Sequence, residues 1–262
     1  MLEGRASWEE VPATLAEHGD FLRDFAAERS VQTNEVARCW VLLPAFLLLA
    51  GEAGVEAVDA IELGPAAGFN LLWDRYRYRY VGGDWGPADA ALELAGEERR
   101  TVPAELLERR LVVRRRVGID LNPVDVENDD AARRLRCFVW ADQRERLERL
   151  DRAIECVRAD PPELLRGDYV ELLAELLAER RPGALTLVYQ TASMAYLTDA
   201  ERERVYGALE AAGRESPVAW VSTTQALDDS LSGFGLDARF WPGKRRVVAH
   251  GDFHGSWLEW LP

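Results

Sequence analysis

From residue 55 onward the chain alternates short apolar runs with helix-like periodicity, and this alternation limits the folds open to it more than any other feature. The apolar runs cover residues 57–63, 111–121, 164–168, 184–189 and 218–222. In the segments between them apolar residues recur every three to four positions, as in an amphipathic helix. This alternation predicts a mostly parallel sheet covered by helices on both faces, which is a Rossmann-like, doubly wound α/β fold.

The amino-terminal part of the chain has a different pattern. Residues 1–52 contain apolar positions at helical spacing and no strand-like run. A helix is predicted over residues 33–49, kinked at Pro44 and ended by Gly51. We therefore expect an N-terminal helical segment at 1–52 and a Rossmann-like domain at 53–262.

Two further segments predict hairpins. Residues 76–81, YRYRYV, alternate with period two, which predicts a hairpin inserted near 76–113. This insertion could border a substrate pocket, form a dimer contact, or be an ordinary amphipathic hairpin with exposed arginines. Residues 236–241 and 246–250 flank a Pro-Gly pair, which predicts a terminal antiparallel hairpin at the edge of the sheet.

Composition restricts the partners of the chain. It has 32 basic and 46 acidic residues and a net charge of −14, which disfavours nucleic acid and anionic lipid. The longest apolar run, residues 39–51, is shorter than the ~20 residues of a membrane span. Cys39, Cys137 and Cys156 form no C-x-x-C pair. We expect a cytoplasmic protein that binds a small-molecule substrate, and its oligomeric state stays open.

A glycine-containing turn follows the first predicted strand. The residues are Glu62-x-Gly64-x-Ala66-x-Gly68, where glycine lets a ligand approach the backbone and a following helix presents free N–H groups. Asp120 ends the next strand and can accept hydrogen bonds from ribose hydroxyls beside this turn. Alternatively, the glycines only make a tight turn. A dinucleotide site fits less well, because the spacing is not G-x-G-x-x-G.

Together with Gly167-Asp168 and the terminal hairpin, these residues resemble the class I methyltransferases that use S-adenosylmethionine. More narrowly, the chain looks like a bacterial family known as domain of unknown function 2332. The segments that carry this second resemblance are residues 31–36 (VQTNEV), 62–80, 118–125 (GIDLNPVD) and 257–261 (WLEWL). That family has no established activity, so the expected activity comes from the class I resemblance alone.

The class I resemblance implies a role for each matching position. Residues expected to hold S-adenosylmethionine are Gly64, Ala66 and Gly68 at its methionine part, Glu62 at its amino group, Asp120 at the ribose, Leu121 at the adenine ring and Asp168 at the adenine amine. Residues expected to face the substrate are Tyr189, Gln190, Thr191 and Glu35. Two departures stand out: Ala66 replaces a glycine of the turn, and the gap between Glu62 and Asp120 is long.

Candidates for a catalytic base are few. His250 and His254 lie near the last strands and histidine titrates near neutrality, and Tyr189 is a further candidate. The two histidines have i, i+4 spacing around Asp252, but they lack helical context and a clear third ligand, so no metal is expected. The missing base and Ala66 support an alternative, a non-catalytic binding or assembly module that retains the methyltransferase fold.

Overall fold

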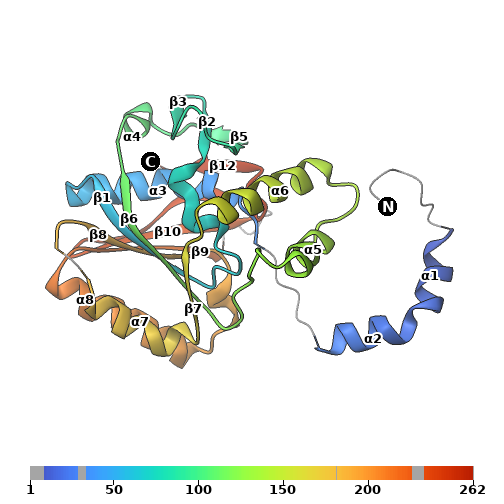
Figure 1. The fold of residues 1–262 in the computed structure, drawn as a ribbon. Coiled ribbons are helices and arrows are strands. Elements are labelled where there is room, and N and C mark those ends of the chain that lie inside the picture. The colour runs from blue at the N-terminus through green and yellow to red at the C-terminus, as the bar shows by residue number, and fades with distance from the viewer. Residues whose placement is uncertain (1–8, 29–33, 181, 226–232, 262) are drawn as a thin grey trace.

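A nine-stranded mixed sheet forms the centre of the fold (Figure 1). The computed structural model describes residues 9–28, 34–180, 182–225 and 233–261. The strands of this sheet lie in the order β5-β12-β11-β10-β9-β8-β1-β6-β7. Their bounds are β1 Ala57–Leu63, β5 Glu97–Arg100, β6 Val112–Asp120, β7 Glu163–Arg166, β8 Leu185–Gln190, β9 Val218–Gln225, β10 Phe234–Trp241, β11 Arg245–Gly251 and β12 Trp257–Trp260.

Five adjacent strands, β7-β6-β1-β8-β9, pair parallel to one another, which confirms the predicted mostly parallel α/β sheet. β1 pairs with β6 on one side and with β8 on the other, and β7 and β9 extend the sheet outward. The chain winds from β1 to β6 and β7, then returns to the other side of β1 for β8 and β9. The winding therefore reverses between β1 and β8, and in open α/β sheets ligands bind beyond the carboxyl ends of the strands at such a point.

The predicted terminal hairpin is present as β10 and β11, but it does not form the edge of the sheet. β12 pairs antiparallel with β11, and β5 pairs parallel with β12 outside it. β5 belongs to the segment expected to be a separate insertion. Earlier in that segment, a small second sheet consists of β2 Arg77–Tyr80, β3 Gly83–Trp85 and β4 Glu93–Leu94.

Helices cover both faces of the large sheet (Figure 1). α3, η1 and α6 lie on one face, whereas α7 and α8 lie on the other, and each face has its own cluster of buried apolar side chains. The helices are α1 Val11–Glu17, α2 Gly19–Glu28, α3 Arg38–Ala53, η1 Phe69–Arg75, α4 Ala104–Leu107, α5 Asp129–Cys137, α6 Arg144–Ala159, α7 Tyr169–Ala178, η2 Ser193–Tyr196 and α8 Asp199–Glu215. Of the helices described here, none is long and apolar enough to cross a membrane.

Helix α3 differs from its prediction at both ends. It begins at Arg38 rather than at residue 33, runs through Gly51, and ends before Gly54, whose φ of 67° makes the left-handed cap. Pro44 lies inside the helix. Nearly every residue between Cys39 and Ala50 is buried, so the apolar surface that α3 removes from water outweighs the low helix propensity of Gly51.

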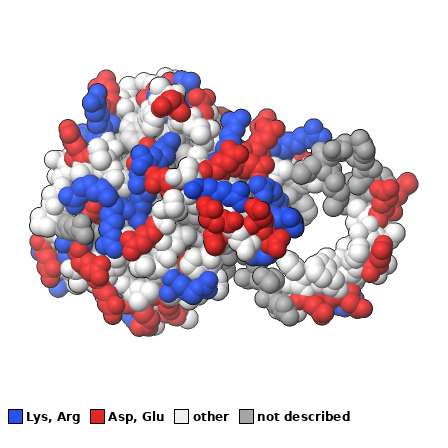
Figure 2. Space-filling view, in the orientation of Figure 1, with Lys and Arg blue, Asp and Glu red and all other residues white. Residues whose placement is uncertain are grey.

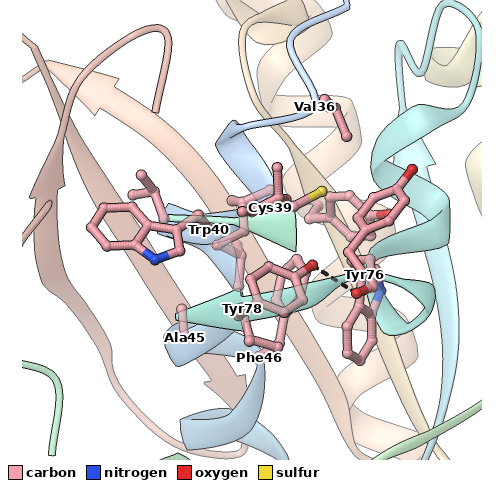
Figure 3. Close-up of a cluster of buried hydrophobic side chains, with 14 of the residues drawn as sticks. Val36, Cys39, Trp40, Ala45, Phe46, Tyr76 and Tyr78 are labelled. Atoms are coloured by element: carbon pink, nitrogen blue, oxygen red, sulfur yellow. Dashed lines mark hydrogen bonds between the residues drawn. The ribbon is translucent and has the colours of Figure 1, made fainter. Parts of the chain in front are cut away.

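The tyrosine-rich strand β2 packs against α3. Figure 3 shows Tyr76 and Tyr78 beside Cys39 and Phe46 in this buried cluster. The hydroxyl of Tyr76 donates to the carbonyl of Phe69 at 2.7 Å, and that of Tyr78 to the carbonyl of Trp73 at 2.6 Å. Each buried hydroxyl therefore has a partner. Three roles were considered for this segment. The buried tyrosines fit an amphipathic strand with one face on the core.

Candidate functional site

The turn between β1 and η1 is held by hydrogen bonds within the chain. Gly64, Ala66 and Gly68 have φ values of 75°, 52° and 80°, all in the left-handed region. The N–H of Gly64 donates to the carbonyl of Ile119 at 2.9 Å, and that of Ala66 to Asp120 Oδ2 at 2.9 Å. The turn is therefore tied to the carboxyl end of β6, as expected from the order of the strands.

The glycines of this turn are required by packing. A Cβ atom at Gly64 would lie 2.6 Å from the Cβ of Ser193, and one at Gly68 would lie 2.7 Å from Cγ of Pro162. Both distances are far below van der Waals contact. Ala66 tolerates its left-handed conformation at a cost of about 1–2 kcal/mol. The turn is thus explained by contacts with the protein itself, whether or not a ligand lies on it.

Glu62 lies one residue before the carboxyl end of β1 and is a charged residue in a buried stretch. Its side chain is 1% exposed, and its Oε1 accepts a hydrogen bond from Asn70 Nδ2 at 3.2 Å. Its Oε2 is buried and has no hydrogen-bond partner in the described part of the chain. Burial raises the pKa of Glu62 to about 8, although Asn70 and the charge of Arg38 oppose this shift.

Arg38 brings three elements together above Glu62. It lies at the first turn of α3, its Nη1 donates to Thr191 Oγ1 at 3.0 Å, and its Nε donates to the carbonyl of Phe253 at 2.8 Å. Burial lowers the pKa of Arg38, while the charges of Glu35 and Glu62 oppose the shift. The guanidinium therefore supplies positive charge to a buried, otherwise acidic site.

The residues just before α3 cover the turn. The Nδ2 of Asn34 donates to the carbonyl of Pro65, and the Oδ1 of Asn34 is buried without a hydrogen-bond partner among the described residues. Glu35, expected to face a pocket, is buried and forms ion pairs with Arg146 at 2.5 Å and Arg149 at 3.3 Å. Two buried oxygens near this turn, Asn34 Oδ1 and Glu62 Oε2, therefore lack a hydrogen-bond partner among the described residues.

The predicted ribose and adenine residues lie on the other side of the turn. Asp120 is 9% exposed and accepts from the N–H of Asn122 at 2.8 Å as well as from Ala66. Asp168 caps α7 by accepting from the N–H of Val170 at 2.8 Å, and Leu121 is 64% exposed. A cavity of about 400 Å³ lies on this side, lined by residues that include Ala67, Val124, Val126, Pro162, Leu164 and Arg166.

The side chains of consecutive residues at the end of β8 lie on different faces of the sheet. Tyr189 is fully buried on the α3 face, where its ring lies 5.0 Å from that of Phe46 and its hydroxyl donates to the carbonyl of Asn70 at 3.0 Å. Burial raises the pKa of Tyr189 well above its usual value. Gln190 points to the opposite face, where its Nε2 donates to Ser222 Oγ at 2.6 Å. Of the three, only Thr191 contacts Arg38.

Of the two histidines, His250 is not brought to Glu62. His250 lies on β11, four strands from β1, which corresponds to roughly 19 Å across the sheet. It is buried, with Nδ1 3.5 Å from Glu259 Oε2. His254 is exposed in the turn before β12 and follows Phe253, whose carbonyl accepts from Arg38. Within the residues that the structure describes, no three His, Cys, Asp or Glu side chains gather as metal ligands would.

Sequence reasoning missed Arg38, Asn34 and Asn70. Asn70 offered a signal, because it is the one strongly polar residue between Phe69 and Trp73 in an apolar run. Arg38 offered none, since an arginine before the apolar stretch that follows it is typical of a solvated helix end. Its partners Thr191 and Phe253 are more than 150 residues away in the sequence, and only the tertiary fold brings them together.

Two comparisons with known proteins bear on this chain. None of the curated proteins matches it. A family model does match, over residues 2–260, and its description reads "Uncharacterized protein conserved in bacteria (DUF2332)". The match covers nearly the whole sequence, including the turn, Asp120 and the strands that carry them. The chain therefore belongs to the DUF2332 family of bacterial proteins.

Proposed function

We propose that this protein is an S-adenosylmethionine-dependent methyltransferase that acts on a small-molecule acceptor. The observation that carries the proposal is the Glu62 carboxylate, buried at the reversal point between β1 and β8 with Oε2 unpartnered among the described residues. A buried acceptor without a donor costs about 1–3 kcal/mol, so a ligand that supplies a donor there is favoured. The strand order of β7-β6-β1-β8-β9 supports a class I methyltransferase-like sheet.

The residues at this edge fit the amino-acid end of S-adenosylmethionine. An ammonium group matches the unpartnered Glu62 Oε2, and the Arg38 guanidinium is placed to attract a carboxylate. The cavity of about 400 Å³ beside the turn has the size of a small-ligand site, and it adjoins the loop after Asp120. When bound, S-adenosylmethionine supplies an electrophilic methyl group on a sulfonium.

The residues of the chain would then act by binding and positioning. Glu62 and Arg38 would hold the amino-acid end, Asp120 would bind the ribose, and Leu121 would cover the adenine. Asp168 would accept a hydrogen bond from the adenine amine. Its side chain is held in place because it also accepts from the N–H of Val170 at the start of α7. Methyl transfer needs alignment and the exclusion of water more than it needs an acid or a base.

The surface supports a small acceptor rather than a nucleic acid. Figure 2 shows acidic and basic side chains interspersed over one face of the molecule. Many arginines are paired with carboxylates, for example Arg114 with Asp59 at 2.8 Å and Arg79 with Glu93 at 2.9 Å. Paired arginines and a net charge of −14 leave little attraction for a phosphate backbone.

The test is direct binding of S-adenosylhomocysteine, the product of methyl transfer. We expect it to raise the unfolding temperature and to titrate calorimetrically, because a ligand at 100 times its dissociation constant adds about 2.7 kcal/mol of stability. NAD, measured in parallel, should have no effect. Glu62→Gln should weaken binding about tenfold or more, since an amide cannot replace a charged partner of an ammonium. Asp120→Asn should weaken it by a similar factor.

Asp74→Asn is the matched control. Asp74 is a mostly buried carboxylate whose pKa burial also raises, and it pairs with Arg116 outside the turn. This variant should bind S-adenosylhomocysteine like the wild type. If neither S-adenosylmethionine nor S-adenosylhomocysteine binds at about millimolar concentration, the proposal is overturned.

A second candidate function is a non-catalytic binding or assembly module. The packing of Gly64 against Ser193 and of Gly68 against Pro162 favours it, because these glycines need no ligand to explain them. Binding of S-adenosylhomocysteine without methyl transfer to any acceptor would support this second candidate.

A further inference from the structure

A second polar site lies on the opposite face of the sheet from Glu62. Gln190 of β8, Ser222 of β9 and Asp237 of β10 stand in one register row, and they are 1%, 4% and 2% exposed. Tyr189 and Glu62 face α3, so Gln190, the next residue of β8, faces α8 with its two neighbours. The row therefore lies on the opposite face of the sheet from the Glu62 side chain.

This row forms the floor of a cavity of about 490 Å³. Tyr206 and Arg202 of α8 line one side, and Phe234 and Phe253 line another, with their rings 5.8 Å apart. The volume is in the range of small-ligand sites, and the lining combines aromatic rings with a few convergent polar groups.

One oxygen of the Asp237 carboxylate lacks a hydrogen-bond partner among the described residues. Its Oδ2 accepts from Arg245 Nε at 2.9 Å, whereas its Oδ1 is buried and unpartnered. Burial raises the pKa of Asp237, although Arg245 opposes the shift. A hydrogen-bond donor on a ligand would satisfy Oδ1.

The charges around Asp237 decide which donor fits. Arg245 already neutralises the carboxylate, and Arg202 lines the same cavity, so a further cation would meet repulsion. A neutral hydroxyl group donates to a carboxylate without adding charge. The rings of Tyr206, Phe234 and Phe253 offer apolar surface to the C–H face of a compact ring.

We propose that this cavity is a binding site for a small polyhydroxylated molecule, such as a monosaccharide or a cyclitol, which donates a hydroxyl hydrogen bond to Asp237 Oδ1. The proposal does not rest on the proposed methyl transfer, because its ligand needs no nucleoside. The cavity meets the Glu62 site at the edge of the sheet, where Thr191 and Phe253 contact Arg38.

The test uses methyl α-D-glucopyranoside and myo-inositol as probes in saturation-transfer NMR titrations of the full chain. We expect saturable binding of at least one probe with a dissociation constant of about 1 mM. Asp237→Asn should weaken binding about tenfold. Asp59→Asn removes a carboxylate that pairs with Arg114 far from this cavity, and it should bind like the wild type.

A second variant covers the case in which Asp237→Asn does not fold. Phe253 is 50% exposed, so Phe253→Ala should fold, and the loss of one ring should weaken probe binding about threefold or more. S-adenosylhomocysteine should not displace the probe. The proposal is overturned if wild type binds neither probe at about 50 mM, if Asp237→Asn binds as well as wild type, or if S-adenosylhomocysteine competes.

Discussion

At the scale of single residues, Glu62 makes the stability of the protein depend on pH. Its folded-state pKa of about 8 is above the unfolded value of 4.5, so the folded state binds the proton more tightly. Its contribution to stability is therefore fully present below about pH 4.5, falls by at most about 1.4 kcal/mol for each unit as the pH rises toward 8, and levels off above that. Glu62→Gln should not show this loss. The difference between its free energy of unfolding and that of the wild type should therefore shift in favour of the variant as the pH rises.

Urea unfolding at several pH values between about 6 and 9 checks this prediction. Glu52→Gln is the control, because Glu52 pairs with Arg246 at the surface, and its curve should follow that of the wild type. Parallel pH dependence of wild type and Glu62→Gln would contradict the assignment of the shift to Glu62.

The same residue predicts how binding of S-adenosylhomocysteine depends on pH. An ammonium group prefers the ionised carboxylate, so binding must release the proton that Glu62 holds below pH 8. The affinity should therefore rise between about pH 6 and pH 8, by up to tenfold per unit. Calorimetry in buffers of different ionisation enthalpy measures the released proton. Glu62→Gln should show neither the rise nor the release.

At the scale of elements, the turn between β1 and η1 depends on the contact of Gly64 with Ser193. Gly64→Ala adds a Cβ atom 2.6 Å from that of Ser193 at a φ of 75°, and it should cost about 2–4 kcal/mol of unfolding free energy. Ser193→Gly in the same chain should recover the part due to the clash but not the backbone cost. Urea unfolding of both single variants and the double variant measures this coupling, and additive effects would argue against it.

Elements with a local signal were predictable, whereas those that depend on distant partners were not. β1 was predicted at its observed bounds, because its apolar run is closed by Gly64 and Pro65. β5, with the sequence EERR, has no apolar alternation and forms only because β12 pairs with it. The site divides in the same way. Glu62 and Asp120 lie near the ends of predicted strands, whereas the unpartnered oxygens and the contacts of Arg38 depend on tertiary packing.

At the scale of the whole molecule, helices α1 and α2 project away from the sheet (Figure 1). None of their residues belongs to either buried apolar cluster, and Leu15 and Phe21 are 53% and 64% exposed. Because stability comes mostly from buried apolar surface, these two helices should add little to it. Removing residues 1–28 should therefore leave the free energy of unfolding within about 0.5 kcal/mol of the full chain.

Urea unfolding of residues 29–262 beside the full chain measures this difference. The slope of the transition should change little as well, since it scales with the surface exposed on unfolding. Cys39→Ala in the truncated chain is the positive control, because its thiol is fully buried in α3 and its loss should destabilise both lengths equally. A loss above about 1 kcal/mol on truncation would mean that α1 and α2 pack against the sheet in solution, and the exposed Leu15 and Phe21 would be the residues that make that contact.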